Sequence, residues 1–274
     1  MIASPVAAGF AYGEGPRWRA GRLWFSDTAS GAVLTMDEAG RLEVAVETEH
    51  PSGLGWLPDG TLVISTLYAA RIKHTGPDGI RVRHDLGDLA WSTNDMVVAP
   101  DGRIYVDLYN RTDAGIAGSI ALVTPDGEVQ VVATDLETPN GLGLTPDGST
   151  LLVSETFGAR LLAFTVGADG SLRDQRVFAD LDGRHPDGLC VDVEGAVWVG
   201  CYDSGEFVRV RDGGEVTHRV EIGPGWAVVP ALGGVDRRTL YMIIDETTHG
   251  GIARSESRGR IEQVRVDVPG SGSP

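Results

Sequence analysis

The sequence predicts an all-β protein, a six-bladed β-propeller. Six segments share one order of features: a polar residue, a small apolar run, an Asp-Gly-type turn and an apolar strand. They span residues 13–25, 51–64, 93–106, 139–153, 186–199 and 225–243. A marker residue in the second strand recurs at intervals of 39, 42, 47, 46 and 43 residues, at Trp24, Val63, Tyr105, Leu152, Trp198 and Tyr241. Periods of roughly 40 to 50 residues built from strands and turns are typical of propellers.

Two hairpin turns in each repeat predict four antiparallel strands per blade, which we call A to D from the central channel outward. The first turn joins strands A and B at residues 59–60, 101–102, 147–148 and 194–195. The second turn joins strands C and D at residues 38–40, 77–79, 125–127, 168–170 and 212–214.

The sixth repeat has no D strand of its own. Its C strand matches residues 259–266, and residues 6–12 precede the first A strand without belonging to a blade. We therefore expect the N-terminal strand to complete the last blade and close the ring, because closure removes sheet edges that invite aggregation. Residues 246–258 then form a long loop. Residues 1–268 form a single domain, and residues 269–274 form a flexible tail.

The composition restricts the classes of partner. There are 39 acidic and 23 basic residues, for a formal net charge of −16. Such a charge repels phosphate backbones and anionic lipids, so we expect a small-molecule substrate and a hard cation rather than nucleic acid or a membrane. No apolar run reaches about 18 residues, and no basic residue precedes Arg17. We expect a cytoplasmic protein that is a monomer or a weak homo-oligomer.

The propeller geometry predicts which polar residues meet. All A strands start from the same face, so the residue before each of them lies at one mouth of the channel: Glu14, Ser52, Asn94, Asn140 and Asp187, with the Trp226 region in the sixth blade. The ends of the B strands arrive at the same mouth, with Asp27, Tyr68, Asp107, Tyr109, Glu155, Thr156, Tyr202, Asp203 and Asp245. We therefore expect the chemistry to be on this face.

Glu14, Asn140 and Asp187 each directly precede a glycine. Two carboxylates and an amide oxygen suit a hard divalent cation, with Ca²⁺ expected and Mg²⁺, Mn²⁺ and Zn²⁺ kept as alternatives. Asparagine and aspartate also commonly cap turns. Their recurrence at one position of the repeat favours a metal site over that structural role. Asn94 is expected to orient the substrate or act as an outer ligand. His249, in the long loop, is a weaker candidate for part of a lid.

Several stretches resemble the family of senescence marker protein (regucalcin), gluconolactonase and luciferin-regenerating enzyme. They are residues 13–18 with 23–27, 93–95 with 100–103, 139–142 with 146–148, and the continuous 186–200. The resemblance extends over essentially the whole chain. It implies a propeller that holds a divalent metal through Glu14, Asn140 and Asp187 and hydrolyses lactones, with Asn94 near metal-bound water or substrate and Asp187 as the general base.

The substrate pocket departs from the pattern of that family. Its sugar-lactone members carry an arginine two residues before the position of Asn94, where this chain has Ser92. Serine lacks the paired hydrogen-bond donors of the arginine guanidinium, and this difference argues against aldonolactones as substrates. We expect Ser92 and Asn94 to shape a different substrate-binding pocket, together with Tyr68, Asp107, Tyr109 and Trp226.

These features together predict a metal-dependent hydrolase that opens a lactone or related cyclic ester with metal-activated water, the proton passing to Asp187. Two alternatives stay open. A Lewis acid beside a carboxylate base would also serve an isomerase or lyase. A propeller can also be a non-catalytic metal- or ligand-binding module, because a fold does not imply a function.

Overall fold

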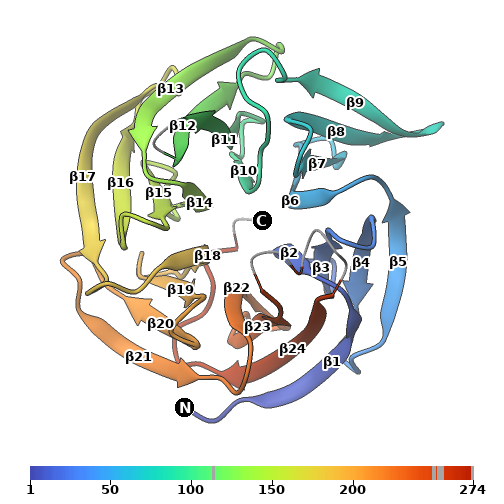
Figure 1. The fold of residues 1–274 in the computed structure, drawn as a ribbon, viewed down its shortest axis with the longest axis vertical. Coiled ribbons are helices and arrows are strands. Elements are labelled where there is room, and N and C mark those ends of the chain that lie inside the picture. The colour runs from blue at the N-terminus through green and yellow to red at the C-terminus, as the bar shows by residue number, and fades with distance from the viewer. Residues whose placement is uncertain (113–114, 249–250, 252–255, 273–274) are drawn as a thin grey trace.

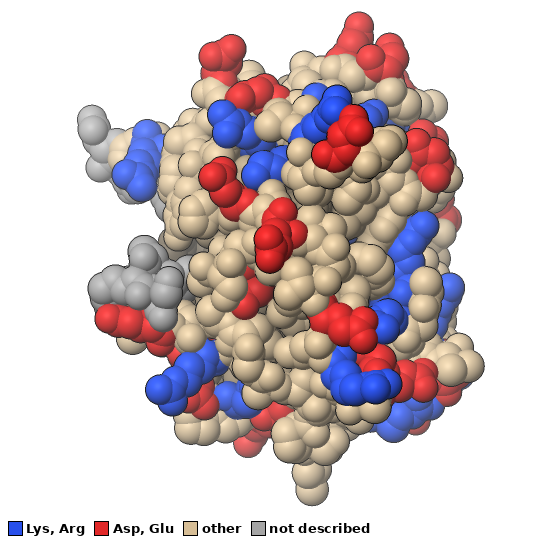
Figure 2. Space-filling model, turned by 90° about the vertical axis from the view of Figure 1, so that its right-hand side faces the viewer, with Lys and Arg blue, Asp and Glu red and all other residues tan. Residues whose placement is uncertain are grey.

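Six four-stranded antiparallel sheets surround a central channel in the computed structural model (Figure 1), which describes residues 1–112, 115–248, 251 and 256–272. This arrangement confirms the predicted six-bladed β-propeller. No helix among the described residues is long and apolar enough to cross a membrane. On the face drawn in Figure 2, basic and acidic side chains are interspersed rather than separated into two patches.

The strands of each blade follow one another from the channel outward. Blades 1 and 2 consist of β2 (Gly13–Arg19), β3 (Arg22–Asp27), β4 (Ala32–Met36), β5 (Leu42–Glu47), β6 (Pro51–Trp56), β7 (Leu62–Thr66), β8 (Arg71–Gly76) and β9 (Gly79–Asp85). Blades 3 and 4 consist of β10 (Met96–Val98), β11 (Ile104–Thr112), β12 (Gly115–Val123), β13 (Val129–Leu136), β14 (Pro139–Leu144), β15 (Thr150–Glu155), β16 (Arg160–Val166) and β17 (Leu172–Asp180). Blades 5 and 6 consist of β18 (Pro186–Val191), β19 (Val197–Cys201), β20 (Glu206–Val210), β21 (Val216–Glu221), β22 (Trp226–Gly233), β23 (Thr239–Glu246), β24 (Arg258–Arg265) and β1 (Ser4–Phe10).

The second strand of each blade is apolar because neighbouring blades cover both of its faces. All five residues of β7 are buried, as are all five of β19. A strand buried on both sides has a nearly continuous apolar run instead of alternation. The outermost strands β5 and β13 are largely exposed or half-buried, because only one of their faces packs on the blade.

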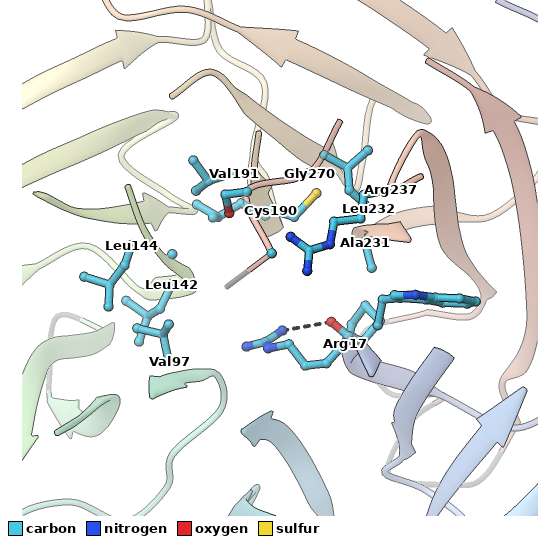
Figure 3. Close-up of a pocket in the computed structure, with 16 residues that line it drawn as sticks. Arg17, Val97, Leu142, Leu144, Cys190, Val191, Ala231, Leu232, Arg237 and Gly270 are labelled. Carbon is cyan, nitrogen blue, oxygen red and sulfur yellow. Dashed lines mark hydrogen bonds between the residues drawn. The ribbon is translucent and has the colours of Figure 1, made fainter. Parts of the chain in front are cut away.

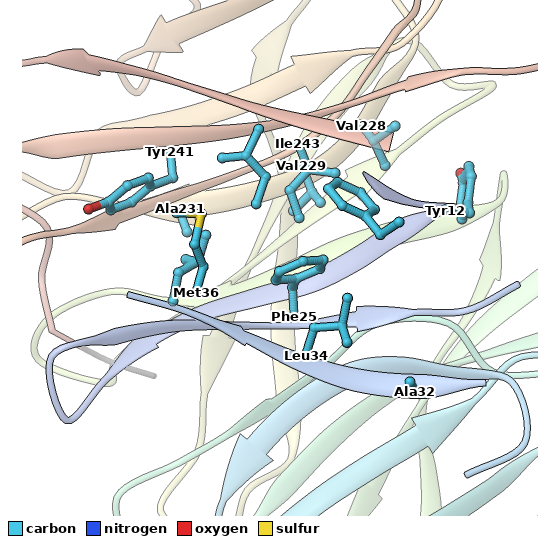
Figure 4. Close-up of a cluster of buried hydrophobic side chains, with 13 residues drawn as sticks. Tyr12, Phe25, Ala32, Leu34, Met36, Val228, Val229, Ala231, Tyr241 and Ile243 are labelled. Atoms are coloured by element: carbon cyan, nitrogen blue, oxygen red, sulfur yellow. The ribbon is translucent and has the colours of Figure 1, made fainter. Parts of the chain in front are cut away.

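The N-terminal strand closes the ring, as predicted. β1 pairs antiparallel with β24 and completes the sixth blade in the order β1-β24-β23-β22. Phe10, at the end of β1, packs edge-on against Phe25 of blade 1 with 4.9 Å between ring centroids. The cluster around them joins the first and last blades (Figure 4) and contains Met36, Val229 and Ile243. Closure therefore rests on apolar packing as well as strand pairing.

The segment after β24 lies beside the turn that follows β18, at the end of the channel opposite Asp187. In Figure 1 this segment runs to the centre of the ring. Val193 N–H donates to Pro269 O at 3.0 Å, Ser271 N–H donates to Val191 O at 3.1 Å, and Gly270 N–H donates to Arg237 O at 2.9 Å. The sequence led us to expect a flexible tail from residue 269. Residues 269–271 are instead hydrogen-bonded to blades 5 and 6. No local sequence pattern predicts these contacts.

Replacing Phe10 with alanine is expected to lower the free energy of unfolding by about 3–5 kcal/mol, because it leaves a cavity between the first and last blades. Urea denaturation measures the change. The matched control is Phe157→Ala, at a side chain that is 56% exposed, which should cost much less. Equal losses in the two variants would contradict a closing role for Phe10.

Candidate active site

The polar residues at the channel mouth lie at β-bulges of the innermost strands. In blade 4 the pairing passes from Pro139 with Glu155 to Leu142 with Val153, so Asn140 lies in a step with one extra residue. Similar register shifts occur in blades 1, 2 and 5 at Glu14, Ser52 and Asp187. Bulges re-aim side chains and are common beside functional sites. These residues were expected just before the strands, but each is the second residue of its strand.

Glycine follows these residues because the inner strands nearly touch there. A Cβ atom on Gly141 would lie 2.5 Å from Leu189 N, and one on Gly188 would lie 2.3 Å from Val229 Cγ2. Gly15 has a positive φ of 53°, and its Cβ would lie 2.4 Å from Ser52 O. Only glycine permits such close approach. The close approach brings the side chains of the preceding residues toward one mouth.

Glu14 and Asp187 are buried carboxylates of blades 1 and 5, which blade 6 separates, and they are 5% and 6% exposed. Burial raises the pKa of Glu14, and the charge of Asp187 raises it further. Burial raises the pKa of Asp187 to about 7 against a lowering hydrogen bond from Asn140. Asp187 Oδ1 has no hydrogen-bond partner among the described residues. The Glu14 and Asp187 carboxyls therefore interact electrostatically, and the buried Asp187 Oδ1 atom remains available to a ligand.

A chain of polar side chains links four blades across the mouth. Ser52 Oγ donates to Asn94 Oδ1 at 2.5 Å, and Asn94 Nδ2 donates to Asn140 Oδ1 at 3.0 Å. The Asn140 amide also lowers the pKa of Asp187, so it lies beside that carboxyl. An amide oxygen has two lone pairs, so Asn140 Oδ1 can accept the bond from Asn94 and still bind a cation. The chain thus orients both amides relative to the carboxylates.

Carboxylates at the ends of the second strands fix the backbone that carries the site. Asp107 accepts N–H groups from Asn94 at 2.5 Å and Asp95 at 3.0 Å, and Asp245 accepts the Gly13 N–H at 3.2 Å. Asp107 has no exposed surface. We expected Asp107 to contact the substrate, but its position makes it a residue that positions Asn94, because both of its oxygens are used by the backbone.

The other expected substrate residues divide into buried and exposed ones. Ser92 is buried, and its Oγ accepts the Tyr68 N–H at 3.0 Å. Tyr109 is buried, and its hydroxyl donates to Pro139 O at 2.5 Å. Tyr68 is 44% exposed, and Trp226 is half-buried with its ring 5.1 Å from that of Tyr202. Tyr68 and Trp226 therefore offer surface to a ligand, whereas Ser92 and Tyr109 hold the walls in place.

The sequence analysis did not identify three residues of the site: the ion pair of Arg17 and Asp95, and Tyr12. Arg17 Nη2 pairs with Asp95 Oδ1 at 3.1 Å inside the channel, and Asp95 Oδ2 accepts the Leu142 N–H at 2.9 Å. Asp95 occupies a position where other repeats have glycine, which was the available signal. Tyr12 is buried, and burial followed by the charge of Glu14 raises the pKa of its phenol. Tyr12 lies in the short link between β1 and β2, and no local motif marks it.

The far half of the channel has a different character. The cavity drawn in Figure 3 is lined by apolar side chains, among them Val97, Leu144 and Leu232, and by two arginines, Arg17 and Arg237. Cys190 also lines it, and burial raises the pKa of this thiol, which forms no disulfide. The carboxylates and amides are therefore confined to one mouth.

The donor set fits a hard cation better than a soft one. In the part of the chain that the structure describes, no group of three or more His, Cys, Asp and Glu side chains is arranged to hold a metal. The expected set has only two such residues, Glu14 and Asp187, with the amide of Asn140 as the third oxygen donor. His185 Nδ1 is hydrogen-bonded to Asp203 Oδ2 at 2.5 Å. His249 lies outside the described residues.

Comparison with known proteins gives several matches. The chain is 29% identical to a 6-deoxy-6-sulfogluconolactonase of Pseudomonas putida over 66% of this chain and 64% of that protein. It is 28% identical to the pentonolactonase XacC of Haloferax volcanii over 96% of this chain and 92% of that protein. A solved Xanthomonas campestris structure described as a gluconolactonase superposes with a TM-score of 0.75 at 26% identity, covering 95% of this chain and 88% of that one.

A family match covers most of the propeller. Residues 12–245 match the family described as the SMP-30/Gluconolactonase/LRE-like region, a span that includes Glu14, Asn94, Asn140 and Asp187. The resemblance found in the sequence is thereby confirmed, and this chain belongs to the SMP-30/gluconolactonase/LRE-like family.

Proposed function

We propose that the protein is a divalent-metal-dependent hydrolase that opens lactones or related cyclic esters. The observation that carries the proposal is the pair of buried carboxylates, Glu14 and Asp187, held at one mouth with Asp187 Oδ1 unpaired among the described residues. Buried charges are normally paired or bind metals. The names of the relatives, a sulfogluconolactonase and a pentonolactonase, support lactones as the substrate class.

Glu14, Asn140 and Asp187 would hold the cation. Their donors are all oxygen, which favours Ca²⁺, with Mg²⁺ and Mn²⁺ as the next candidates. When bound, a divalent cation would polarise the ester carbonyl and lower the pKa of a water molecule. Three protein donors leave room for substrate and water, as a catalytic site requires.

The residues of the chain would perform the proton transfer and the positioning. Asp187 takes a proton from the attacking water and returns it to the ring oxygen as the carbon–oxygen bond breaks. Asn94 is held by Ser52 and Asp107, so its amide can orient the reacting groups without a large loss of entropy. Tyr12 and Tyr109 are buried beside the carboxylates, and their raised pKa values keep both phenols neutral.

Removing divalent cations with a chelator is expected to lower kcat/KM on any lactone that the protein opens by about 100-fold or more, because the site loses its main stabiliser of developing negative charge. A panel of lactones is assayed before chelation, after it, and after adding back Ca²⁺, Mg²⁺ or Mn²⁺ separately. Full activity after verified metal removal would contradict the metal dependence. No opening of any lactone with any ion would favour the isomerase, lyase or binding-module alternatives.

The Asp187→Asn variant is expected to lower kcat by about 10²- to 10⁴-fold, because the amide cannot accept the proton from water. Steady-state kinetics separates this loss from a change in KM. The matched control is Asp212→Asn, at an exposed aspartate paired with Arg176 on the surface, which should leave kcat unchanged. A kcat for Asp187→Asn within tenfold of the wild-type value would rule out Asp187 as the base.

The Glu14→Gln variant is expected to stabilise the cation-free protein by about 1 kcal/mol, because it removes one of two buried like charges. The same variant should lose most of the rise in melting temperature that Ca²⁺ gives the wild type. Differential scanning calorimetry with and without Ca²⁺ measures both effects. Glu43→Gln, at an exposed glutamate of β5, is the control. An undiminished response to Ca²⁺ in Glu14→Gln would remove Glu14 from the proposed ligand set.

A further inference from the structure

Four aromatic rings form a continuous row along one side of the channel mouth. Phe157 lies 5.9 Å from His185, His185 lies 6.0 Å from Tyr202, and Tyr202 lies 5.1 Å from Trp226, measured between ring centroids. The residues come from blades 4, 5 and 6, so three successive blades build the row. We call these four residues the aromatic arc.

The aromatic arc borders the carboxylate site. His185 is two residues before Asp187, and the charge of Asp187 acts on the Tyr202 phenol. Trp226 is the register partner of Asp245, the residue that accepts the N–H of Gly13 beside Glu14. The aromatic arc therefore lies beside Asp187 on the side of blades 5 and 6.

The aromatic arc leaves part of its ring surface accessible to solvent, although Trp226 also packs against the core that joins the first and last blades. Phe157 is 56% exposed, and Tyr202 and Trp226 are half-buried. Backbone hydrogen bonds fix the main chain that carries two of the rings, since Tyr202 N–H donates to His185 O at 3.2 Å and Phe157 N–H donates to Glu137 O at 3.3 Å. Rings fixed beside a reactive site lose little entropy when they bind a flat ligand. Large exposed aromatics are informative because they mark contact surfaces.

We propose that the aromatic arc selects lactones that carry an aromatic ring, a substrate class that rests on the proposed lactonase function. Aromatic rings pair favourably in stacked or edge-on geometries, which Tyr202 and Trp226 can offer to a ring fused to the lactone. A sugar lactone presents hydroxyl groups instead, which need hydrogen-bond partners and gain little from ring faces. The named sugar lactonases are 28% and 29% identical to this chain, which leaves room for a different substituent pocket.

The test compares two six-membered lactones that share an alcohol leaving group, 3-isochromanone with a fused benzene ring and δ-valerolactone without one. Tyr202→Leu and Trp226→Leu are expected to lower kcat/KM for 3-isochromanone about tenfold more than for δ-valerolactone, mainly through KM. Tyr202→Phe and Trp226→Phe keep a ring and should restore most of the preference. Wild type should also prefer 3-isochromanone to glucono-δ-lactone by about tenfold or more.

The matched control is Trp56→Leu, at the end of β6 away from the mouth, where the ring is covered by the Arg19 guanidinium at 4.8 Å. This variant should leave the ratio between the two lactones unchanged. Equal losses on both lactones in the leucine variants of Tyr202 and Trp226 would overturn the proposal, as would a wild-type preference for the sugar lactone. A change of ratio in Trp56→Leu alone would overturn it as well.

A binding measurement separates this inference from the proposed activity. The lactam counterpart of 3-isochromanone is resistant to hydrolysis, and calorimetry gives its Kd. We expect it to bind about tenfold more tightly than δ-valerolactam, and to lose that advantage in Tyr202→Leu. If no lactone is opened but this pattern of binding holds, the aromatic arc stands and the hydrolase proposal fails. If lactones are opened and the two lactams bind alike, the aromatic arc proposal fails alone.

Discussion

The innermost strands of neighbouring blades approach one another closely, and the position of the site follows from this packing. At Gly15 and Gly141 a Cβ atom would lie within 2.5 Å of a backbone atom of the neighbouring strand, so the backbones touch where side chains would normally separate them. The bulge beside each glycine turns the preceding side chain toward the mouth. Packing at the axis and the gathering of Glu14, Asn140 and Asp187 therefore have a single cause, and strand closure through Phe10 maintains it.

The same gathering works against stability. Glu14 and Asp187 are buried close enough to raise the pKa of Glu14, while Asp187 Oδ1 finds no partner among the described residues. Arg17 donates hydrogen bonds to Met96 O and to Asp95 rather than to Glu14 or Asp187. Such an arrangement is expected where a fold maintains a site for a cation at the expense of its own stability.

The mouth combines a polar centre with apolar walls. Asp107 and Asp245 hold the backbone beneath the centre, and the aromatic arc lines one side of it. The other end of the channel combines apolar side chains with Arg17 and Arg237 and borders the hydrogen-bonded residues 269–271. The carboxylates and amides thus gather at one end of the propeller, because A strands run in the same direction in every blade.

The blade count, the four strands per blade, the closing N-terminal strand and the candidate ligands could be predicted from the sequence, because turns, apolar periodicity and repeat position are local or periodic signals. The folded chain was needed to show that Asp107 positions backbone, that Ser92 supports Tyr68, that Tyr12 and Arg17 border the site, and that Phe157 lies in one row with Tyr202. Most of these relations join residues of different blades, and the contact of Asp107 with Asn94 joins two segments of blade 3 that are 13 residues apart in the sequence. Ring closure creates such contacts, and no stretch of sequence contains them.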